Sequence, residues 1–265
     1  MGTYEELFMK IKWSGLADAK YFQHIAQYCL PSWEKLPGDK HIVHDDTLIT
    51  YNFINLVNWD NIVNYNSEYW VTYNNGKKKT NSFWKKMQSQ VWAVRNLKNC
   101  DVLILLDTDI EVLNFNKKKF NAMLEDFLSL DYIWATGQSQ RKGHDSGFII
   151  FNMNHPKLNE LIDYYENIWD SGTIFKLKKS YDGHAVESMF DKYPSYKIPN
   201  IDYGNGFHVY DLGFVHYGSK IPKKLRQESK FNGEKIVEEY TADKEIKWTK
   251  HSWAVHGPWK DDNEQ

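Results

Sequence analysis

Two aspartates, Asp107 and Asp109, directly follow an apolar run over residues 102–106 and are separated by a single threonine. A continuous run of this kind, bounded by polar residues, is typical of a strand buried on both faces of a sheet. In open α/β sheets, ligands bind beyond the carboxyl ends of the strands. Two carboxylates this close repel each other unless a cation lies between them, and their hard oxygens favour Mg²⁺ or Mn²⁺. The pair predicts a metal site outside the core; the simpler alternative is a turn or helix cap after the strand.

The elements that must position this pair alternate between helix and strand. Apolar spacing predicts helices over residues 17–33, 82–97, 120–130, 158–169 and 184–190. It predicts strands over residues 7–13, 41–44, 102–106, 132–136 and 148–151. A helix followed at once by a buried strand is the α/β pattern. No linker divides the chain, so we expect a single α/β domain with a mixed, mostly parallel sheet flanked by helices and an irregular C-terminal third.

Composition excludes several classes of protein. A chain of 265 residues can bury a core without disulfides or structural metal. Its formal net charge of −2 argues against a nucleic-acid partner, and its two cysteines cannot build a disulfide framework. The N-terminal residues lack the basic and apolar regions of a signal peptide, and no apolar run is long enough to cross a membrane. We therefore expect a cytoplasmic protein without a transmembrane segment.

Further polar motifs lie before and after the aspartate pair. Asp45 and Asp46 follow the strand predicted over residues 41–44. Asp145 begins an Asp-Ser-Gly-Phe-Ile-Ile-Phe-Asn segment, and Asp182 opens the helix that continues over 184–190. Two late histidines are each followed four residues on by a lysine, as His216 with Lys220 and His256 with Lys260.

Taken in order, these motifs resemble the nucleotide-sugar-dependent glycosyltransferases of the GT-A fold, in particular families 8 and 34. The resemblance spans about residue 40 to the C-terminus and departs from the family pattern at three positions. Asp145 replaces an asparagine, and Gly183 and His184 stand where family 8 has glutamine and aspartate. Phosphatases of the haloacid dehalogenase type also place Asp-x-Asp after a strand, but Glu111 stands where they need threonine or valine.

The resemblance implies one GT-A-like domain over residues 1–265. A nucleotide-binding half of about residues 1–110 would end in the Asp-x-Asp motif. A half of about residues 111–265 would bind the donor sugar and the acceptor.

It also implies roles for the metal and nucleotide ligands. Asp109 is the main ligand of Mn²⁺ or Mg²⁺, and Asp107 binds the metal and touches the ribose. A late histidine completes the metal site; we favour His256 over His216 because Gly257, Trp259 and Lys260 follow it as in the closing motif of family 8.

Other residues would bind the rest of the donor. Lys260 or Lys220 would bind the diphosphate, and Gly257 belongs to the same closing motif. Asp45 would hold the base or ribose, with a solvated turn as the alternative. Lys85 and Lys86, on the helix before the key strand, are within reach of a phosphate.

Asp145 and Asp182 are the carboxylates that remain for the sugar and the acceptor. Donor-sugar binding is the expected role of Asp145. Asp182 is expected to bind the sugar or to act as general base on the acceptor hydroxyl, although aspartate is also a favoured helix cap.

The function that these motifs imply is a metal-dependent transfer of a sugar from a nucleoside diphosphate sugar to an acceptor hydroxyl, with a glycan as the expected acceptor. A UDP-sugar is the favoured donor and a GDP-sugar the alternative. A metal-dependent nucleotidyl or phosphoryl transferase would use the same carboxylates, although the chain lacks a glycine-rich phosphate loop. A non-catalytic carbohydrate-binding protein would use the aromatic side chains, which make up 16% of the chain.

Overall fold

The structure is a computed structural model. It describes residues 9–18, 22, 26–45, 49–62, 78–112, 115–138, 144–177, 182–198 and 214–216. Within these ranges the side chains of residues 78–82, 137–138, 144–145, 197 and 214–216 are not described.

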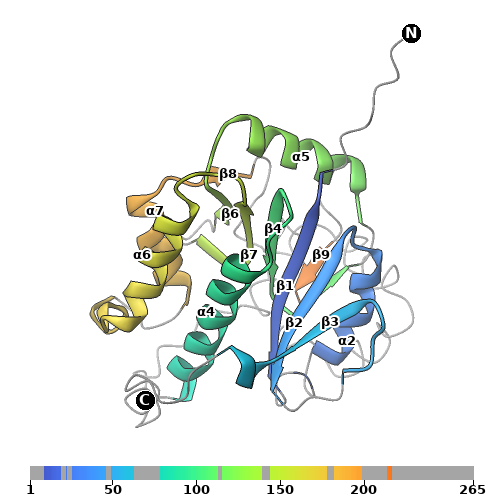
Figure 1. The fold of residues 1–265 in the computed structure, drawn as a ribbon, viewed down its shortest axis with the longest axis horizontal. Helices are drawn as coiled ribbons and strands as arrows, with labels where there is room; N and C mark the ends of the chain where they lie inside the picture. The colour runs from blue at the N-terminus through green and yellow to red at the C-terminus, as the bar shows by residue number, and fades with distance from the viewer. Residues whose placement is uncertain are drawn as a thin grey trace, which may run out of the picture.

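A seven-stranded sheet forms the centre of the molecule (Figure 1), with the strand order β3-β2-β1-β4-β7-β6-β8. The strands are β1 (Ile11–Asp18), β2 (Asp39–Asp45), β3 (Ile54–Asn58), β4 (Val102–Leu106), β6 (Trp134–Gln138), β7 (His144–Asn152) and β8 (Tyr196–Lys197). Strands β3, β2, β1 and β4 are parallel to one another, and β8 is parallel to β6. Strand β7 runs antiparallel to both β4 and β6. The mixed, mostly parallel α/β sheet predicted from the sequence is therefore confirmed.

Helices cover both faces of this sheet. They are α2 (Gln27–Cys29), α4 (Lys78–Asn96), α5 (Lys117–Ser129), α6 (Leu158–Asp170) and α7 (Asp182–Lys192), with the 3₁₀ helices η2 (Leu30–Lys35), η3 (Trp59–Asn61) and η4 (Thr173–Lys176). Two short antiparallel strands, β5 (Ile110–Val112) and β9 (Phe214–His216), form a second sheet.

The core is divided between the two faces of the large sheet, as β4 illustrates. Leu103 and Leu105 pack in a cluster with side chains of α4, α6 and α7, whereas Val102, Ile104 and Leu106 pack in a cluster with α5 and η2. A strand that is buried on both faces in this way needs a continuous apolar sequence. Both ends of β4 could therefore be predicted from the length of its apolar run.

The N-terminal elements differ from the prediction. Strand β1 spans Ile11–Asp18 rather than residues 7–13, and Ala17 and Asp18, predicted to start a helix, are its last residues. The end of that predicted helix is the short α2 followed by η2, in which Pro31 occupies the first turn. The pairing of β1 with β2 and β4 outweighs the local helical pattern around Ala17.

The carboxyl ends of β1, β2, β3 and β4 lie along one edge of the sheet, because these strands are parallel. Asp45 ends β2, Asn58 ends β3, and Asp107 directly follows β4. Among the helices that the structure describes, none has the length and apolarity needed to span a bilayer.

Candidate active site

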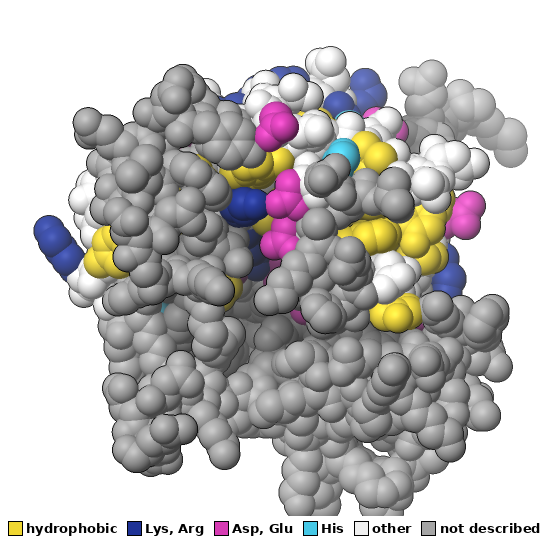
Figure 2. Space-filling model, turned by 90° about the horizontal axis from the view of Figure 1, so that it is seen from below, with side chains coloured by type: hydrophobic (Ala, Val, Ile, Leu, Met, Phe, Trp, Pro, Cys, Tyr) yellow, Lys and Arg dark blue, Asp and Glu magenta, His cyan; other side chains and the backbone are white. Residues whose placement is uncertain are grey.

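The Asp-Thr-Asp segment forms a tight turn between β4 and β5. The backbone N–H of Asp107 donates to the carbonyl of Gly147 on β7 at 2.9 Å, and the N–H of Ile110 donates back to the carbonyl of Asp107 at 3.0 Å. Figure 2, seen from the carboxyl edge, shows acidic side chains next to basic ones near the middle of this face. The turn therefore holds the aspartate pair where parallel α/β sheets bind ligands.

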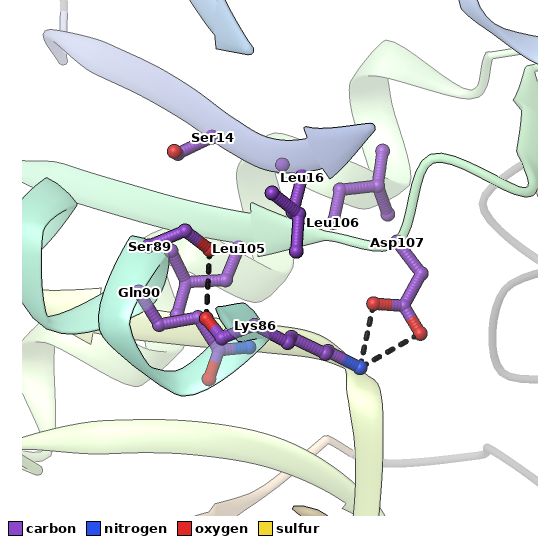
Figure 3. Close-up of a pocket in the computed structure, with 9 residues that line it drawn as sticks. Ser14, Leu16, Lys86, Ser89, Gln90, Leu105, Leu106 and Asp107 are labelled. Atoms are coloured by element: carbon purple, nitrogen blue, oxygen red, sulfur yellow. Dashed lines mark hydrogen bonds and ion pairs between the residues drawn. The ribbon is translucent and has the colours of Figure 1, made fainter. Parts of the chain in front are cut away.

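Lys86 joins two predicted site motifs that are far apart in the sequence. It lies on α4, and its Nζ is 2.7 and 2.9 Å from the two carboxylate oxygens of Asp107 (Figure 3). The same Nζ donates to Oδ2 of Asp182, at the start of α7, at 2.7 Å. Asp107 and Asp182 therefore both form ion pairs with the ammonium group of Lys86.

Around Lys86, the negative charges of the aspartates exceed the positive charge of the lysine. The charges of Asp109 and Asp182 both act on Asp107, and Lys86 is a cation that contacts Asp107 and Asp182. Burial raises the pKa of Asp107, and Asp109 and Asp182 raise it further, against the opposing effect of Lys86. Burial favours the neutral amine of Lys86, but Asp107 and Asp182 outweigh it and raise the pKa of that lysine. The excess of negative charge favours a further cation.

Asp109 lies in a different environment from Asp107. The sequence analysis predicted that both aspartates lie outside the core, and for Asp109 this prediction is wrong, because the residue is only 8% exposed. It is drawn inward because β5 begins at the next residue, where the carbonyl of Ile110 accepts a 2.9 Å hydrogen bond from Nε1 of the buried Trp33. Burial, together with the charges of Glu111 and Asp109, also raises the pKa of the neighbouring Cys29 thiol.

The donors present fit a hard divalent cation. Oδ1 of Asp109 is buried and has no hydrogen-bond partner among the described residues, which is a costly state for a carboxylate oxygen unless a cation binds it. The described side chains contain no group of three or more His, Cys, Asp or Glu able to hold a metal ion. Among the described side chains of these four types, the aspartate pair therefore has no third ligand.

The two candidate histidines are placed differently. The backbone of His216 lies in β9 opposite Ile110, the residue after Asp109, but its side chain is not described. His256 lies outside the described residues, as do Gly257, Lys220 and Lys260. Of the two histidines, the structure describes only His216, and its backbone lies near the carboxylate pair.

Asp45 lies at the same edge of the sheet, at the end of β2. Its Oδ2 accepts a 2.7 Å hydrogen bond from Nζ of Lys85, the neighbour of Lys86 on α4. The ammonium of Lys85 also lies 5.4 Å from the ring centroid of Trp59 in η3. Adjacent lysines of one helix therefore contact the ends of two parallel strands, β2 and β4. Asp46 lies outside the described residues.

Asp182 is buried at the first turn of α7, with 5% of its surface exposed. Its Oδ1 accepts from the N–H of Gly183 at 2.9 Å while Oδ2 binds Lys86. The carboxylate therefore contacts the first turn of α7 and the site at the same time. Its bond to the next residue is not the bond of a helix cap, which accepts from an N–H two or three residues on. The backbone of Asp145 belongs to β7, and its side chain is not described.

A small pocket opens beside Lys86 and Asp107. It has about 220 Å³ of empty space, including its open mouth, and it is lined by residues of β1, α4 and β4 (Figure 3). Gly15 of β1 lines it, and a Cβ atom there would lie 2.7 Å from the carbonyl oxygen of Leu106. Glycine is therefore required where β1 closely approaches the end of β4.

The contact of Lys86 with the two aspartates was not predicted from the sequence. The two lysines before the key strand indicated contact with a phosphate but not which lysine faces the aspartates. The signal in the sequence is the position of Lys86 beside Met87, Gln90 and Val91, which are buried on α4. A lysine at the margin of a buried helix face needs an acidic partner.

The chain matches no protein-family model and no curated protein sequence. Several solved structures are similar to it, and they are glycosyltransferases. A glycosyltransferase involved in glycosylation of the major capsid of PBCV-1 is 14% identical, with a TM-score of 0.49, and the match covers 83% of this chain and 98% of that one. Mouse xyloside xylosyltransferase 1 is 12% identical, with a TM-score of 0.49 and coverage of 81% and 99%. Galactosyltransferase LgtC, solved with donor and acceptor sugar analogues, is 10% identical, with a TM-score of 0.46 and coverage of 68% and 70%. At these TM-scores and identities the similarity assigns no role to any residue of this chain.

Proposed function

We propose that this protein is a metal-dependent glycosyltransferase that moves a sugar from a nucleoside diphosphate sugar to an acceptor hydroxyl, with a UDP-sugar as the favoured donor and a glycan as the acceptor. The observation that carries the proposal is the contact of Lys86 with both Asp107 and Asp182. It joins the turn after β4 to the start of α7, so one site holds acidic groups from two distant segments and a cation among them. Residues of about 1–110 would bind the nucleotide, and residues of about 111–265 the donor sugar and the acceptor.

The chemistry of the transfer matches these groups. The bond between the anomeric carbon and the diphosphate oxygen breaks and a bond to the acceptor oxygen forms. The acceptor hydroxyl gives its proton to a base, for which Asp182 is the candidate if it does not bind the sugar. Mn²⁺ or Mg²⁺, when bound, supplies a Lewis acid for the departing diphosphate. Asp109 and Asp107 would hold this ion together with His216 or His256, and the backbone position of His216 opposite Ile110 supports the former.

The remaining residues would bind different parts of the donor. Lys86 carries a cation that can bind the diphosphate or the sugar once the donor has entered. Lys260 or Lys220 would add a second cation, next to Gly257 in the first case. Asp45, held by Lys85, would bind the base or ribose. Asp145 would bind hydroxyls of the donor sugar.

Product analysis tests the proposed function directly. With Mn²⁺ and a panel of nucleotide sugars but no acceptor, slow hydrolysis should release the free nucleoside diphosphate, and EDTA should stop it. Arg95→Gln is a suitable control, because Arg95 forms an exposed ion pair with Asp163 and Glu166 away from the site. Release of a sugar phosphate, which requires cleavage of the bond between the two phosphates, would indicate nucleotidyl or phosphoryl transfer instead. Sugar binding that is indifferent to EDTA and yields no product would indicate a carbohydrate-binding protein.

Replacing Asp182 distinguishes a catalytic role from a helix cap. In the proposed function, Asp182→Asn should lower kcat far more than nucleotide affinity, because the carboxylate serves the sugar or the acceptor rather than the nucleotide. Asp191→Asn, an exposed position on the same helix, should change neither quantity. A loss of stability with an unchanged rate would show that Asp182 serves only the fold, as a helix cap or as the ion-pair partner of Lys86. Kinetics and thermal melting on the same samples separate the two results.

A further inference from the structure

The middle residue of the Asp-Thr-Asp turn is anchored to a neighbouring strand. Thr108 is 1% exposed, and its Oγ1 donates a 2.7 Å hydrogen bond to the backbone carbonyl of Leu16 on β1. Leu16 lies beyond the last residue of β1 that pairs with β4, which is Ser14. The Thr108 hydroxyl therefore joins the two strands where their backbone ladder has ended.

The methyl group of Thr108 also faces β1, at Gly15. A Cβ atom built on Gly15 would lie 2.9 Å from Cγ2 of Thr108 and 2.7 Å from the carbonyl oxygen of Leu106. The end of β1 thus approaches the turn so closely that only glycine fits at position 15 without a shift. Both branches of the Thr108 side chain are in contact with β1.

The ends of the turn are held by other contacts. Asp107 donates its N–H to Gly147, and the carbonyl of Ile110 accepts from Trp33. A third bond, from the N–H of Ile110 to the carbonyl of Asp107, closes the turn on itself. The hydroxyl of Thr108 adds a side-chain bond from the residue between the two aspartates to β1.

We propose that Thr108 is a positioning residue that sets the separation of the Asp107 and Asp109 carboxylates for the divalent cation, an inference that rests on the proposed function. Metal ligands must lie within a few tenths of an ångström of their ideal positions, and the residues that orient them affect affinity strongly. Asp109 has a particular need for such support, since its buried Oδ1 has no hydrogen-bond partner among the described residues to hold it in place.

Valine is the informative replacement, because it keeps the shape of threonine and removes the donor. Mn²⁺ binding to the full chain, measured from the EPR signal of the free ion with and without UDP, should weaken about tenfold in Thr108→Val. Thr108→Ser keeps the hydroxyl and should restore most of the affinity. If Thr108→Val does not fold, Thr108→Ala removes the same donor without a branched side chain and should show the same loss.

Thr136→Val is the matched control. Thr136 is fully buried on β6, and its hydroxyl also donates to a strand carbonyl, that of Phe148, at 3.4 Å. This variant should lose thermal stability to a similar degree and bind Mn²⁺ as the unmodified protein does. A purely structural role for Thr108 would make the two valine variants behave alike.

Two results would overturn the inference. Unchanged Mn²⁺ affinity in Thr108→Val, or equal losses in Thr108→Val and Thr108→Ser, would show that the hydroxyl does not position the carboxylates, while the metal site itself would stand. Absence of Mn²⁺ binding to the unmodified protein would instead remove the proposed function together with this role of Thr108.

Discussion

Replacing Asp109 with asparagine should reduce Mn²⁺-dependent turnover of a nucleotide sugar by more than about 100-fold, beyond the loss that follows removal of a residue supporting a metal ligand. The reason is the position of this carboxylate, which is 8% exposed and has a buried oxygen without a hydrogen-bond partner in the described structure. The fold should persist, because asparagine has the same shape. Burying a neutral amide costs less than burying a carboxylate, so the melting temperature should stay the same or rise. Mn²⁺ titration, kinetics and thermal melting on one preparation measure all three effects.

Asp39→Asn is the matched control for this variant. Asp39 is exposed and begins β2, so it lies at the opposite edge of the sheet from the site. It should retain activity and metal affinity. Applying the same titration to His216→Ala and His256→Ala identifies which histidine completes the metal site. Full activity of Asp109→Asn, or activity that EDTA does not reduce, would refute the assignment of a metal to this pair.

Replacing Lys86 with methionine should damage both activity and stability. The ammonium lies 2.7 Å from Asp107 and 2.7 Å from Asp182, and its side chain is 15% exposed. Methionine retains the apolar stem but leaves the two carboxylates facing each other. Removing one partner of a buried ion pair costs about 3 kcal/mol, so the midpoint of urea unfolding should fall clearly. Turnover should fall as well, since the same cation is proposed to bind the donor.

Two further variants separate these effects. Lys85→Met removes the neighbouring lysine, which forms an ion pair with the more exposed carboxylate of Asp45, and it should cost less stability. The double variant Lys86→Met with Asp182→Asn removes one of the two carboxylates and should recover part of the lost stability without recovering activity. An unfolding midpoint of Lys86→Met equal to that of the unmodified protein would show that the lysine does not balance these charges.

The sequence by itself determined the elements whose signals are local. Strand β4 has the predicted bounds because a strand buried on both faces needs an unbroken apolar run. Helices α4 and α6 were predicted within a few residues, since each presents one apolar face over several turns. The aspartate pair was located in the same way, from its position directly after a strand. The roles proposed for Asp45, Asp145 and Asp182 stay predictions.

Only the tertiary structure decided the elements that depend on distant partners. The start and end of β1 follow from its register with β2 and β4, and the loose alternation of its sequence did not reveal them. The strands β5 and β9 are three residues long, too short for any period to show, and they exist because they pair with each other. The burial of Asp109 follows from that same arrangement.

The contacts of Lys86 are the clearest case of this kind. Lys85 and Lys86 are identical in type and adjacent in sequence. The rotation of about 100° between successive residues of a helix directs them to different strands. Which of them meets Asp107 depends on how α4 rotates as its apolar face packs against β4, and Asp182 reaches the same ammonium only once α7 has packed nearby. A local pattern specifies the type of each element, but an ion pair between elements is set by the packing of the core that holds them together.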